Sequence, residues 1–452
     1  MHPYGCCYNR IMKILLVSSS ARGHAIAEAL SRSHHNPQLI CLSPNKNPGL
    51  IALAHRHEAM DIMNFDAVLK IAKEEQPEFA FIGPDDPIAG GLADLLEEQG
   101  IPCIAPRKSL ARIESSKAFA RELMQKHGIN SYPKFMAYQR ADAKSMDRFI
   151  RGDCGGEFVV KYDALKGGKG VKVSGEHIHS VEEGIRYAEE CIAECGKVVI
   201  EEKLIGVEFS LMSFASGTEV ADMPAVQDHK RAYEGDTGPN TGGMGTYSCP
   251  DHSLPFLTPS DLEEAKKINR QIAAALLKEC GHPYRGILYG GFIAVRDGVR
   301  VIEYNARFGD PEALNVLPIL SSDFVELCQS MIEGTFNENF VRFAHQATVC
   351  KYITPKSYPD GKMEKGQEVI FPKSTETGRI YYGDISQEGS GKLLLGGSRS
   401  SGIVGMGSSL EEAEKIAQKM CSEVKGPVRF RADIGTEELV QQRVEMMKKL
   451  RS

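Results

Sequence analysis

The sequence predicts an α/β fold that opens with a doubly wound parallel sheet and continues into mixed α+β modules. In the first hundred residues, short apolar runs alternate with segments in which apolar residues recur every three or four positions. That alternation is typical of strands and helices that take turns along the chain in a parallel sheet. Beyond Gly128 the strand-like and helical segments lose this regularity, which favours α+β modules. The length of 452 residues suits about three domains.

The composition excludes several classes of protein. Hydrophobic residues make up 42% and charged residues 25%, so neither a disordered chain nor a disulfide scaffold fits. The 60 acidic and 54 basic residues are spread along the chain, and no basic arm indicates nucleic acid or a membrane as partner. No apolar run approaches the ~18–20 residues that cross a bilayer. The twelve cysteines lack metal-ligand spacing, so we expect reduced thiols in a cytoplasmic protein.

Four strands and three helices are expected in the N-terminal region. The strands cover residues 14–17, 39–42, 79–82 and 102–105, and the helices cover residues 24–32, 66–75 and 88–98. Ligands of such sheets bind at the carboxyl ends of the strands. Two predicted loops lie there, residues 18–23 and 83–87, although the second also fits a plain proline turn. Residues 1–11 carry no signal-peptide core and are interpreted as an extension.

The later elements are predicted from the same patterns. A long helix over residues 109–127 should end at Gly128. A small α+β module follows, with strands at 134–138, 158–161, 171–174 and 198–204 and a helix at 181–195. Next come antiparallel neighbours at 208–213 and 220–226, a helix at 260–280, and a strand pair at 290–295 and 300–304. The last predicted elements are strands at 348–353 and 392–395 and a helix at 409–424.

A lysine inside an apolar strand is the first chemical signal. Lys161 lies in an apolar strand, after Phe158, Val159 and Val160, and a buried ammonium needs an anion beside it. A short glycine-rich stretch follows, formed by Gly167, Gly168, Lys169 and Gly170. Its bare backbone N–H groups and second cation suit a loop that closes over phosphates. The stretch is not a Walker loop, and a hairpin turn is the alternative, but together with Lys161 it predicts a nucleotide site.

Glutamates on and after the next strand suit the rest of a nucleotide. Glu201 and Glu202 end an apolar run that leads to Leu204, and Glu208 follows four residues later. Such a segment can present backbone groups to an adenine edge, and a carboxylate such as that of Glu208 can hold both ribose hydroxyls. Taken alone, these glutamates also fit solvated strand positions.

A third segment combines a carboxylate, an amide and a guanidinium. Glu303, Asn305 and Arg307 alternate along a strand and therefore share one face, while Ile302 and Tyr304 point the other way. A carboxylate beside an amide oxygen suits Mg²⁺, which takes substrate phosphates as further ligands. The guanidinium beyond them can bind a carboxylate or phosphate. The alternative is an ordinary polar strand face.

A charged run and a glycine-rich loop complete the chemical signals. Gln227-Asp-His-Lys-Arg231 precedes Asp236-Thr-Gly-Pro-Asn-Thr-Gly-Gly-Met-Gly245. A loop with so many glycines is costly to order without a ligand or close packing. The alternative is a flexible surface loop.

Together these segments resemble the phosphoribosylamine–glycine ligase family of the ATP-grasp superfamily, from about Met12 to the C-terminus. The most specific segments are residues 227–231, 236–245 and 302–312, with support from 115–119 and 431–435. The resemblance implies a parallel-sheet domain at 12–112, a two-lobed ATP-grasp domain at 113–335 with its smaller lobe at about 133–204, and a small C-terminal α+β domain at 336–452. It also implies ATP-dependent ligation of glycine to 5-phosphoribosylamine through a glycyl phosphate, in the second step of de novo purine synthesis.

The resemblance further implies roles for individual residues. ATP phosphates would contact Lys117, Lys161, Gly167, Gly168, Lys169 and Gly170. Adenine would lie against Glu201, Glu202 and Leu204, ribose would bind Glu208, and Mg²⁺ or Mn²⁺ would bind Glu303 and Asn305. The catalytic candidates are Arg307, Asp228, Lys230 and Asn240. The substrate-binding candidates are Arg22, His24, Asp85, Asp86, Asp236, Thr237, Gly238, Pro239, Thr241, Gly242 and Gly243.

One segment departs from the family's pattern. Members usually carry Gly-x-Gly-Gly-Arg-Glu-His-Ala after the first strand, where this chain has Ser18-Ser-Ser-Ala-Arg-Gly-His-Ala25. Serine hydroxyls and backbone amides at a helix N-terminus still suit phosphate. Two alternatives therefore stay open, another ATP-grasp carboxylate–amine ligase with a different amine acceptor and a non-catalytic ATP-binding protein. The expected partners are small molecules only, bound by a monomer or homodimer.

Overall fold

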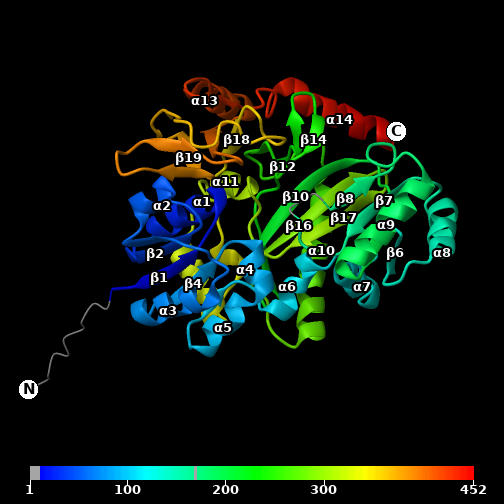
Figure 1. Cartoon of the computed structure of the whole chain (residues 1–452), viewed down its shortest axis with the longest axis horizontal. Coiled ribbons are helices and arrows are strands. Elements are labelled where there is room, and N and C mark those ends of the chain that lie inside the picture. Colours follow the sequence, from blue (N-terminus) through cyan, green and yellow to red (C-terminus); the bar gives the residue numbers. More distant parts are fainter. Residues whose placement is uncertain (1–10, 167–169) are drawn as a thin grey trace, which may run out of the picture.

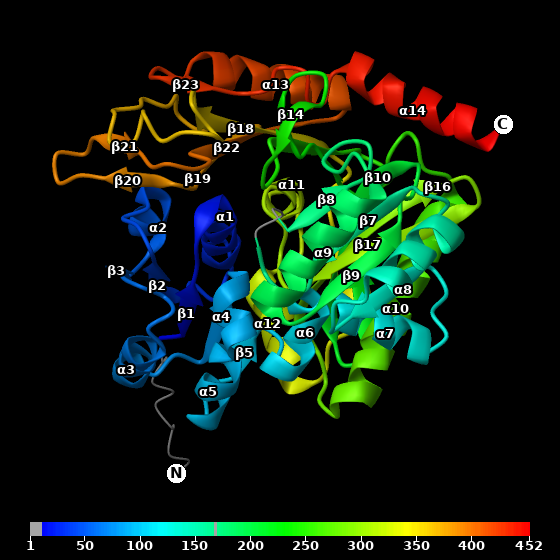
Figure 2. The same ribbon diagram turned by 45° about the vertical axis from the view of Figure 1, so that its right-hand side comes forward.

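The computed structural model describes residues 11–166 and 170–452, so most of the predicted extension and three residues of the glycine-rich stretch lie outside the described residues. Three regions are visible in Figure 1: a blue N-terminal sheet with its helices, a cyan and green two-lobed body, and an orange-to-red C-terminal region. In Figure 2 the C-terminal region lies across the top of the other two. This arrangement confirms the predicted α/β and α+β architecture.

Five parallel strands form the N-terminal sheet in the order β3-β2-β1-β4-β5. They are β1 (Lys13–Val17), β2 (Gln38–Ser43), β3 (Arg56–Ala59), β4 (Phe79–Ile82) and β5 (Cys103–Ile104). The helices are α1 (Ser20–Ser31), α2 (Pro48–Leu53), α3 (Phe65–Glu75), α4 (Asp85–Gly90) and α5 (Leu92–Glu98). The almost entirely apolar and buried β1 and β4 are typical of strands covered on both faces. The strand order reverses between β1 and β4, so the ligand-binding crevice of the sheet is expected there.

The N-terminal predictions need four corrections. The strand β3 was missed because its sequence, Arg-His-Glu-Ala, carries no apolar alternation, and the short helix α2 was missed as well. The loops are shorter than predicted, since α1 begins at Ser20 and α4 at Asp85. The predicted helix 88–98 is interrupted at Gly91, whose φ of +94° ends α4 and opens α5.

The predicted helix 109–127 is two helices, α6 (Lys108–Ser115) and α7 (Lys117–Lys126). Ser116 between them has an extended backbone, with φ −137° and ψ 111°, and its side chain accepts a hydrogen bond from the Phe119 N–H. A serine in this role is an N-cap that starts a new helix. The break places Lys117 in the first turn of α7, where the helix dipole favours an anion.

The smaller lobe of the body is an antiparallel sheet in the order β6-β9-β7-β8 with helices packed beside it. Its strands are β6 (Phe135–Tyr138), β7 (Phe158–Tyr162), β8 (Val171–Val173) and β9 (Val198–Glu202). Its helices are α8 (Ala143–Arg148), which continues into a π-helical turn (Phe149–Asp153), and α9 (Val181–Cys195). The apolar face of α9 packs on β7 and β9 and closes a separate small core.

The larger lobe is an antiparallel sheet in the order β11-β10-β16-β17. Its strands are β10 (Val207–Ser216), β11 (Glu219–Asp222), β16 (Arg285–Val295) and β17 (Gly298–Asn305). The helix α10 (Pro259–Cys280), which begins with a capping box between Thr258 and Asp261, packs on this sheet. Two helices that the sequence analysis missed follow β17, namely α11 (Glu312–Val316) and α12 (Phe324–Glu333).

A six-stranded sheet joins the body to the C-terminal region. Its order is β12-β15-β18-β22-β19, with β23 beside β18. Its strands are β12 (Gln227–Asp228), β15 (Gly245–Ser248), β18 (Ala347–Pro355), β19 (Gly378–Tyr382), β22 (Ser401–Gly407) and β23 (Val428–Arg429). Residues of the body thus pair with strands about one hundred residues later, for example Thr246 with Cys350.

The remaining elements are peripheral. Two small hairpins are formed by β13 (Arg231–Tyr233) with β14 (Thr237–Asn240) and by β20 (Ile385–Gln387) with β21 (Leu393–Leu395). The last helices are a 3₁₀ turn (Glu338–Phe340), α13 (Leu410–Ser422) and α14 (Glu437–Arg451), the last of which was not predicted. Among the described residues, no helix is both long enough and apolar enough to span a bilayer.

Candidate active site

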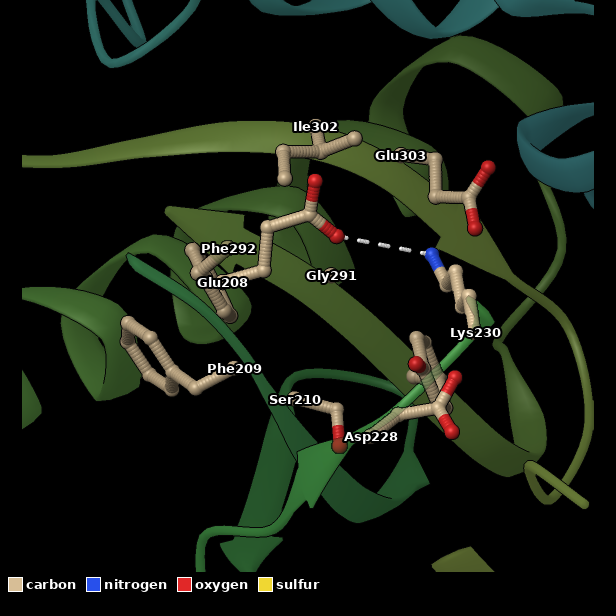
Figure 3. Close-up of a pocket in the computed structure, with 10 residues that line it drawn as sticks. Glu208, Phe209, Ser210, Asp228, Lys230, Gly291, Phe292, Ile302 and Glu303 are labelled. Atoms are coloured by element: carbon tan, nitrogen blue, oxygen red, sulfur yellow. Dashed lines mark ion pairs between the residues drawn. The ribbon is translucent and has the colours of Figure 1, made fainter. Parts of the chain in front are cut away.

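A charged pocket opens in the larger lobe, where β10, β12, β16 and β17 meet (Figure 3). It is lined by Glu208, Phe209, Ser210, Asp228, Lys230, Tyr289, Gly291, Phe292, Ile302 and Glu303. Figure 3 shows the ammonium of Lys230 between the carboxylates of Glu208 and Glu303. We call Glu208, Asp228, Lys230 and Glu303 the pocket cluster. All four were predicted site residues, and they come from three different strands and a loop.

The charges of the pocket cluster are close but loosely paired. The Nζ of Lys230 lies 3.6 Å from Oε2 of Glu208, and the two side chains are 39% and 56% exposed. The carboxylates of Glu208 and Glu303 keep the pKa of Lys230 above its ordinary value. Burial alone would raise the pKa of Glu303, but Lys230, Lys117 and Lys161 hold it below the ordinary value. Both groups are therefore charged at neutral pH, and three lysines surround one glutamate.

Side-chain oxygens that suit a cation come from β12 and β17, in or next to this pocket. Glu303 and Asn305 share a face near the end of β17, as predicted. The buried Oδ1 of Asp228 has no hydrogen-bond partner among the described residues. Burial and the nearby Glu312 raise the pKa of Asp228 well above its ordinary value, so an added cation would restore its charge. These carboxylate and amide oxygens fit Mg²⁺.

The backbone around Ile302 corrects the predicted strand faces. The pairing of β16 with β17 shifts between Gly291 and Phe292, so that Ile302 has no direct partner. Such a bulge turns neighbouring side chains toward the same side, and Ile302 lines the pocket together with Glu303. The prediction that Ile302 points away from Glu303 was therefore wrong. Gly291 lies opposite Glu303, where an added Cβ would approach its Cγ to 3.2 Å.

A second set of charges lies behind the pocket and is fully paired. One carboxylate oxygen of Glu201 lies 2.7 Å from Nζ of Lys161, and the other lies 2.7 Å from Nε of Arg121. Lys161 and Arg121 also donate to the carbonyl oxygen of Ile302 at 2.9 and 2.7 Å. We call Arg121, Lys161 and Glu201 the closed cluster. It supplies the anion that the sequence required beside Lys161, and it engages the Glu201 side chain, so that only the backbone of Glu201 could contribute to an adenine site.

The segment that connects the lobes keeps its predicted position next to this cluster. Glu202 ends β9 and accepts a hydrogen bond of 2.9 Å from the backbone N–H of Lys134. Leu204 and Ile205 connect β9 of the smaller lobe to β10 of the larger lobe. Ile205 is 65% exposed, which leaves an apolar surface at this hinge. This exposed connection between the lobes is a candidate contact for a base.

The first turn of α7 holds the segment that leads into the glycine-rich stretch. Lys117 donates from Nζ to the carbonyl of Ala164 at 3.2 Å. Asp163 accepts hydrogen bonds from the Ser116 hydroxyl at 3.0 Å and from the Ala118 N–H at 2.9 Å. Gly167, Gly168 and Lys169 lie outside the described residues. Gly170 is described, and its carbonyl accepts from the Tyr162 N–H at 2.8 Å.

The predicted loop 236–245 divides into two parts with different surroundings. Its first part pairs as the hairpin β13–β14, whose exposed residues include Thr237, Gly238, Pro239 and Asn240. Asp236 forms ion pairs with Arg431, at 2.7 Å, and with Arg443. The structure therefore does not bring Asp236 and Asn240 to the pocket; Asp236 anchors the hairpin to the C-terminal region.

The second part of this loop returns to the pocket cluster. Thr241 donates from its N–H and its hydroxyl to the carbonyl of Lys230, at 2.7 and 2.9 Å. The carbonyl oxygens of Gly242 and Gly243 both accept from Nη1 of Arg399, at 2.7 and 2.9 Å. Gly243 has a φ of +110°, and a Cβ there would lie 2.7 Å from Oδ1 of Asp228. These glycines are required because backbone packs directly against a site carboxylate.

Three predicted residues meet at the switch between β1 and β4. Although burial would raise the pKa of Asp85, Arg307 and Arg22 hold it below the ordinary value. Arg307 also pairs with Glu114 at 2.8 Å. The Nε atoms of both arginines are buried and have no hydrogen-bond partner among the described residues. The neighbouring Asp86 is exposed. Two guanidiniums with unused donors at a sheet's switch point suit an anionic ligand.

His24 is not available to a substrate. Its Nδ1 accepts a hydrogen bond of 3.0 Å from the Tyr382 N–H, and its ring stacks on the Tyr382 ring at 5.7 Å. Gly49 lies against its other side, since an added Cβ would fall 2.1 Å from the ring. Burial lowers the pKa of His24 to about 4, so the ring is neutral. The substrate-binding prediction for His24 was therefore wrong, because the ring packs between the N-terminal and C-terminal regions.

Asp310 lies in the segment 302–312, and the sequence analysis predicted no role for it. It receives hydrogen bonds from Ser20 and from the Arg22 N–H at 3.2 Å, both in the N-terminal region. Tyr352 and Arg399 of the C-terminal region contact its other oxygen. Asp310 thereby joins all three regions beside the switch point. Its position just after the polar strand could have marked it as a candidate site residue. Its hydrogen-bond partners could not have been found from the sequence, because they lie 290 residues upstream and 42 residues downstream.

Known proteins resemble this chain along nearly its whole length. Family models for three domains of phosphoribosylglycinamide synthetase match this chain. The N domain matches residues 12–114, the ATP-grasp (A) domain matches residues 115–313, and the C domain matches residues 348–437. A phosphoribosylamine–glycine ligase of Methanococcus maripaludis is 45% identical over 446 residues, covering 97% of this chain and 100% of the relative. The ligase of Methanosarcina acetivorans is 44% identical over 441 residues, covering 97% and 98%.

Solved structures agree with this relationship. The phosphoribosylamine–glycine ligase of Thermotoga maritima has a TM-score of 0.78 at 26% identity, covering 93% of this chain and 100% of that one. A biotin carboxylase of Campylobacter jejuni, solved with an ATP analogue, has a TM-score of 0.72 at 14% identity, covering 97% and 96%. The second match shows the ATP-grasp fold alone. The chain belongs to the phosphoribosylglycinamide synthetase family.

Proposed function

We propose that this chain joins glycine to 5-phosphoribosylamine with ATP and releases glycinamide ribonucleotide, ADP and phosphate. The observation that carries the proposal is the pocket cluster, where cations gather around Glu303, in a chain of this family. It is an ATP-dependent carbon–nitrogen ligase of purine biosynthesis. The assignments of individual residues below are part of the proposal.

ATP would lie between the two lobes. The backbone from Glu202 to Leu204 would meet adenine, and Glu208, exposed at the mouth of the pocket, would hold ribose. Lys117 and Lys230 would approach the phosphates, Lys161 would add its positive charge from within the closed cluster, and the glycine-rich stretch that ends at Gly170 would cover them. Such cations stabilise the charge that develops on a transferring phosphoryl group.

The oxygens of Glu303 and Asn305, with Asp228 nearby, would hold Mg²⁺, or Mn²⁺ in its place. When bound, this cation neutralises phosphate charge. The Thr241–Gly243 backbone, which packs on Asp228 and Lys230, would keep these side chains in position. Arg399 would hold the backbone in turn.

The chemistry follows from the poor reactivity of a carboxylate. The glycine carboxylate oxygen attacks the γ-phosphorus of ATP, and the bond to ADP breaks. The amine of phosphoribosylamine then attacks the carbonyl carbon of glycyl phosphate, loses a proton, and phosphate leaves with the electron pair of the broken C–O bond. No residue needs to form a covalent bond. Positioning and electrostatic stabilisation supply the acceleration.

Arg22, Arg307 and Asp85 would hold the acidic and amino groups of glycine and phosphoribosylamine at the switch point. Unused guanidinium donors suit the phosphate or the carboxylate, and Asp85 suits an amine. A ligase with a different amine acceptor is the second candidate, favoured by the Ser18–Ala25 segment. A non-catalytic ATP-binding protein does not account for the intact pocket cluster.

The test is product identification. Protein with ATP, Mg²⁺ and glycine should release ADP in proportion to added phosphoribosylamine, generated in situ, and mass spectrometry should find glycinamide ribonucleotide. Ammonia, ethanolamine and free ribosylamine serve as competing acceptors. Glycinamide ribonucleotide formation supports the proposal, whereas turnover only with another amine favours the second candidate.

We also propose a cytoplasmic location and a monomer or homodimer. The ten cysteines among the described residues are all free thiols, which suits a reducing compartment.

A further inference from the structure

Two histidines and a glutamate cluster outside the pocket, where the turn after α1 meets the start of α12. The Nε2 atoms of His34 and His35 lie 3.5 and 3.8 Å from the same oxygen of Glu326. The rings are 4.2 Å apart between centroids. One ligand atom of each residue lies within 4.8 Å of the other two. Nothing in the proposed ligase reaction uses these side chains.

A neighbouring carboxylate orients one of the histidines. Oδ2 of Asp323 lies 2.8 Å from Nδ1 of His34 and also accepts from its backbone N–H at 3.1 Å. Because an ionised carboxylate only accepts, Nδ1 donates to Asp323, which leaves Nε2 as the nitrogen that a metal ion can bind. A carboxylate behind an imidazole is the usual outer partner of a metal-bound histidine.

The turn itself is fixed before any ion arrives. The Ser33 hydroxyl donates to Asp323 at 2.8 Å, and Nη2 of Arg32 donates to the carbonyl of Leu317 at 2.7 Å. Asp323 also caps α12 through its other oxygen, which positions Glu326 in the first turn. The backbone on both sides is therefore anchored, while the ligand side chains are free to adjust.

The distances suit a small ion with nitrogen ligands. Zinc bonds of ~2.0–2.2 Å place neighbouring ligands of a tetrahedral site roughly 3.3 Å apart. The spacings of 3.5 and 3.8 Å in the cluster need only small rotamer changes, which exposed fractions of 66%, 32% and 58% permit. Two imidazoles with one carboxylate favour zinc, nickel or copper over Mg²⁺.

We propose that His34, His35 and Glu326 form a surface site for a divalent transition metal such as Zn²⁺, with Asp323 as the residue that orients His34. Water would complete the coordination. The ion would connect the N-terminal sheet region to α12, and because it binds the assembled junction, it would stabilise the folded chain.

The test is zinc titration by calorimetry of the reduced, tag-free, full-length protein after chelator treatment. Excess Mg²⁺ occupies the oxygen ligands of the pocket. Wild type should bind one more Zn²⁺ than the His34→Ala/His35→Ala variant, and Glu326→Gln should weaken that site at least tenfold. The same zinc should raise the melting temperature of wild type and not of the double variant.

A second histidine pair provides the matched control. His252 and His345 stack at 4.7 Å, but within the described residues their side-chain hydrogen bonds go to backbone carbonyls, those of Ala344 and Pro250, and to no carboxylate. His252→Ala/His345→Ala should therefore keep the wild-type zinc stoichiometry. Equal stoichiometry and affinity in wild type and in the His34/His35 variant would overturn the site. An unchanged affinity in Glu326→Gln would overturn the three-ligand assignment, and equal metal-free melting temperatures establish that the variants are folded.

Discussion

Both clusters contact β17, the closed cluster through the carbonyl of Ile302 and the pocket cluster through Glu303, and they use the same residue types in opposite ways. In the closed cluster, Glu201 pairs with both cations at 2.7 Å, and no side chain of an ion pair is more than 8% exposed. In the pocket cluster, the Lys230–Glu208 separation is 3.6 Å and both side chains are partly exposed. Charged groups that are fully paired with each other stabilise the fold. Charged groups that are only loosely paired beside a cavity are available to a ligand, so the two clusters should respond differently to substitution.

The largest effect is expected for Glu303→Gln. The substitution removes the carboxylate that Lys117, Lys161 and Lys230 surround and that would hold the metal at the phosphoryl group. We expect kcat to fall by roughly 10²–10³-fold, while the affinity for ATP changes far less. Steady-state kinetics and nucleotide binding by calorimetry measure the two separately. Turnover within about twofold of wild type would place the metal site elsewhere.

Glu201→Gln should act on stability instead. It leaves Lys161 and Arg121 buried beside a neutral amide, and breaking a buried ion pair costs about 3–5 kcal/mol. Urea unfolding measures the loss. Glu202→Gln is the control, because Glu202 is next in sequence but accepts only one exposed backbone hydrogen bond. If the two variants unfold alike, the closed cluster does not stabilise the lobe junction.

Arg22→Ala tests the switch point. If the guanidinium holds the phosphate of phosphoribosylamine, the KM for that substrate should rise about ten- to a hundredfold, because one charged contact is worth ~1.5–3 kcal/mol. The KM values for ATP and glycine should stay nearly constant. Arg22→Lys keeps the charge and should recover part of the affinity. An Arg22→Ala enzyme with unchanged KM values would show that the phosphate binds elsewhere.

The smallest effect is a pH dependence from His24. Its pKa of about 4 in the folded chain lies below the ordinary ~6.5 of an unfolded histidine, so the unfolded state binds more protons. Stability should therefore fall by about 1 kcal/mol between pH 7 and pH 5.5 from this group alone. His24→Asn, whose oxygen can accept from Tyr382, should show a shallower decline in urea unfolding. Parallel pH profiles would contradict the buried, neutral ring.

The sequence predicts elements with strong periodicity and misses interactions that join distant segments. The apolar strand β1 and the amphipathic helix α9 were predicted directly. The break at Ser116 was not, because neither glycine nor proline marks it. Asp236 was predicted to bind substrate. Its ion pair with Arg431 could not be predicted, because the two residues are 195 positions apart in the sequence.

The candidate site shows the same limit. Glu303 and Asn305 were found from alternation within one strand. The role of Glu201 was not, because Arg121 lies 80 residues earlier in the chain and carries no local signal that it is buried. Sequence patterns identify which side chains carry chemistry. Which charges are already neutralised within the fold follows only from tertiary pairing.

The central claim is that the pocket cluster supports ligation of glycine to phosphoribosylamine. The most direct measurement is ADP release by wild type with both substrates, compared with reactions that omit glycine, phosphoribosylamine or Mg²⁺, one at a time. We predict rapid ADP release only in the complete reaction, with glycinamide ribonucleotide formed in equal amount and with Glu303→Gln inactive. ADP release that is unaffected by phosphoribosylamine, or full activity in Glu303→Gln, would contradict the account.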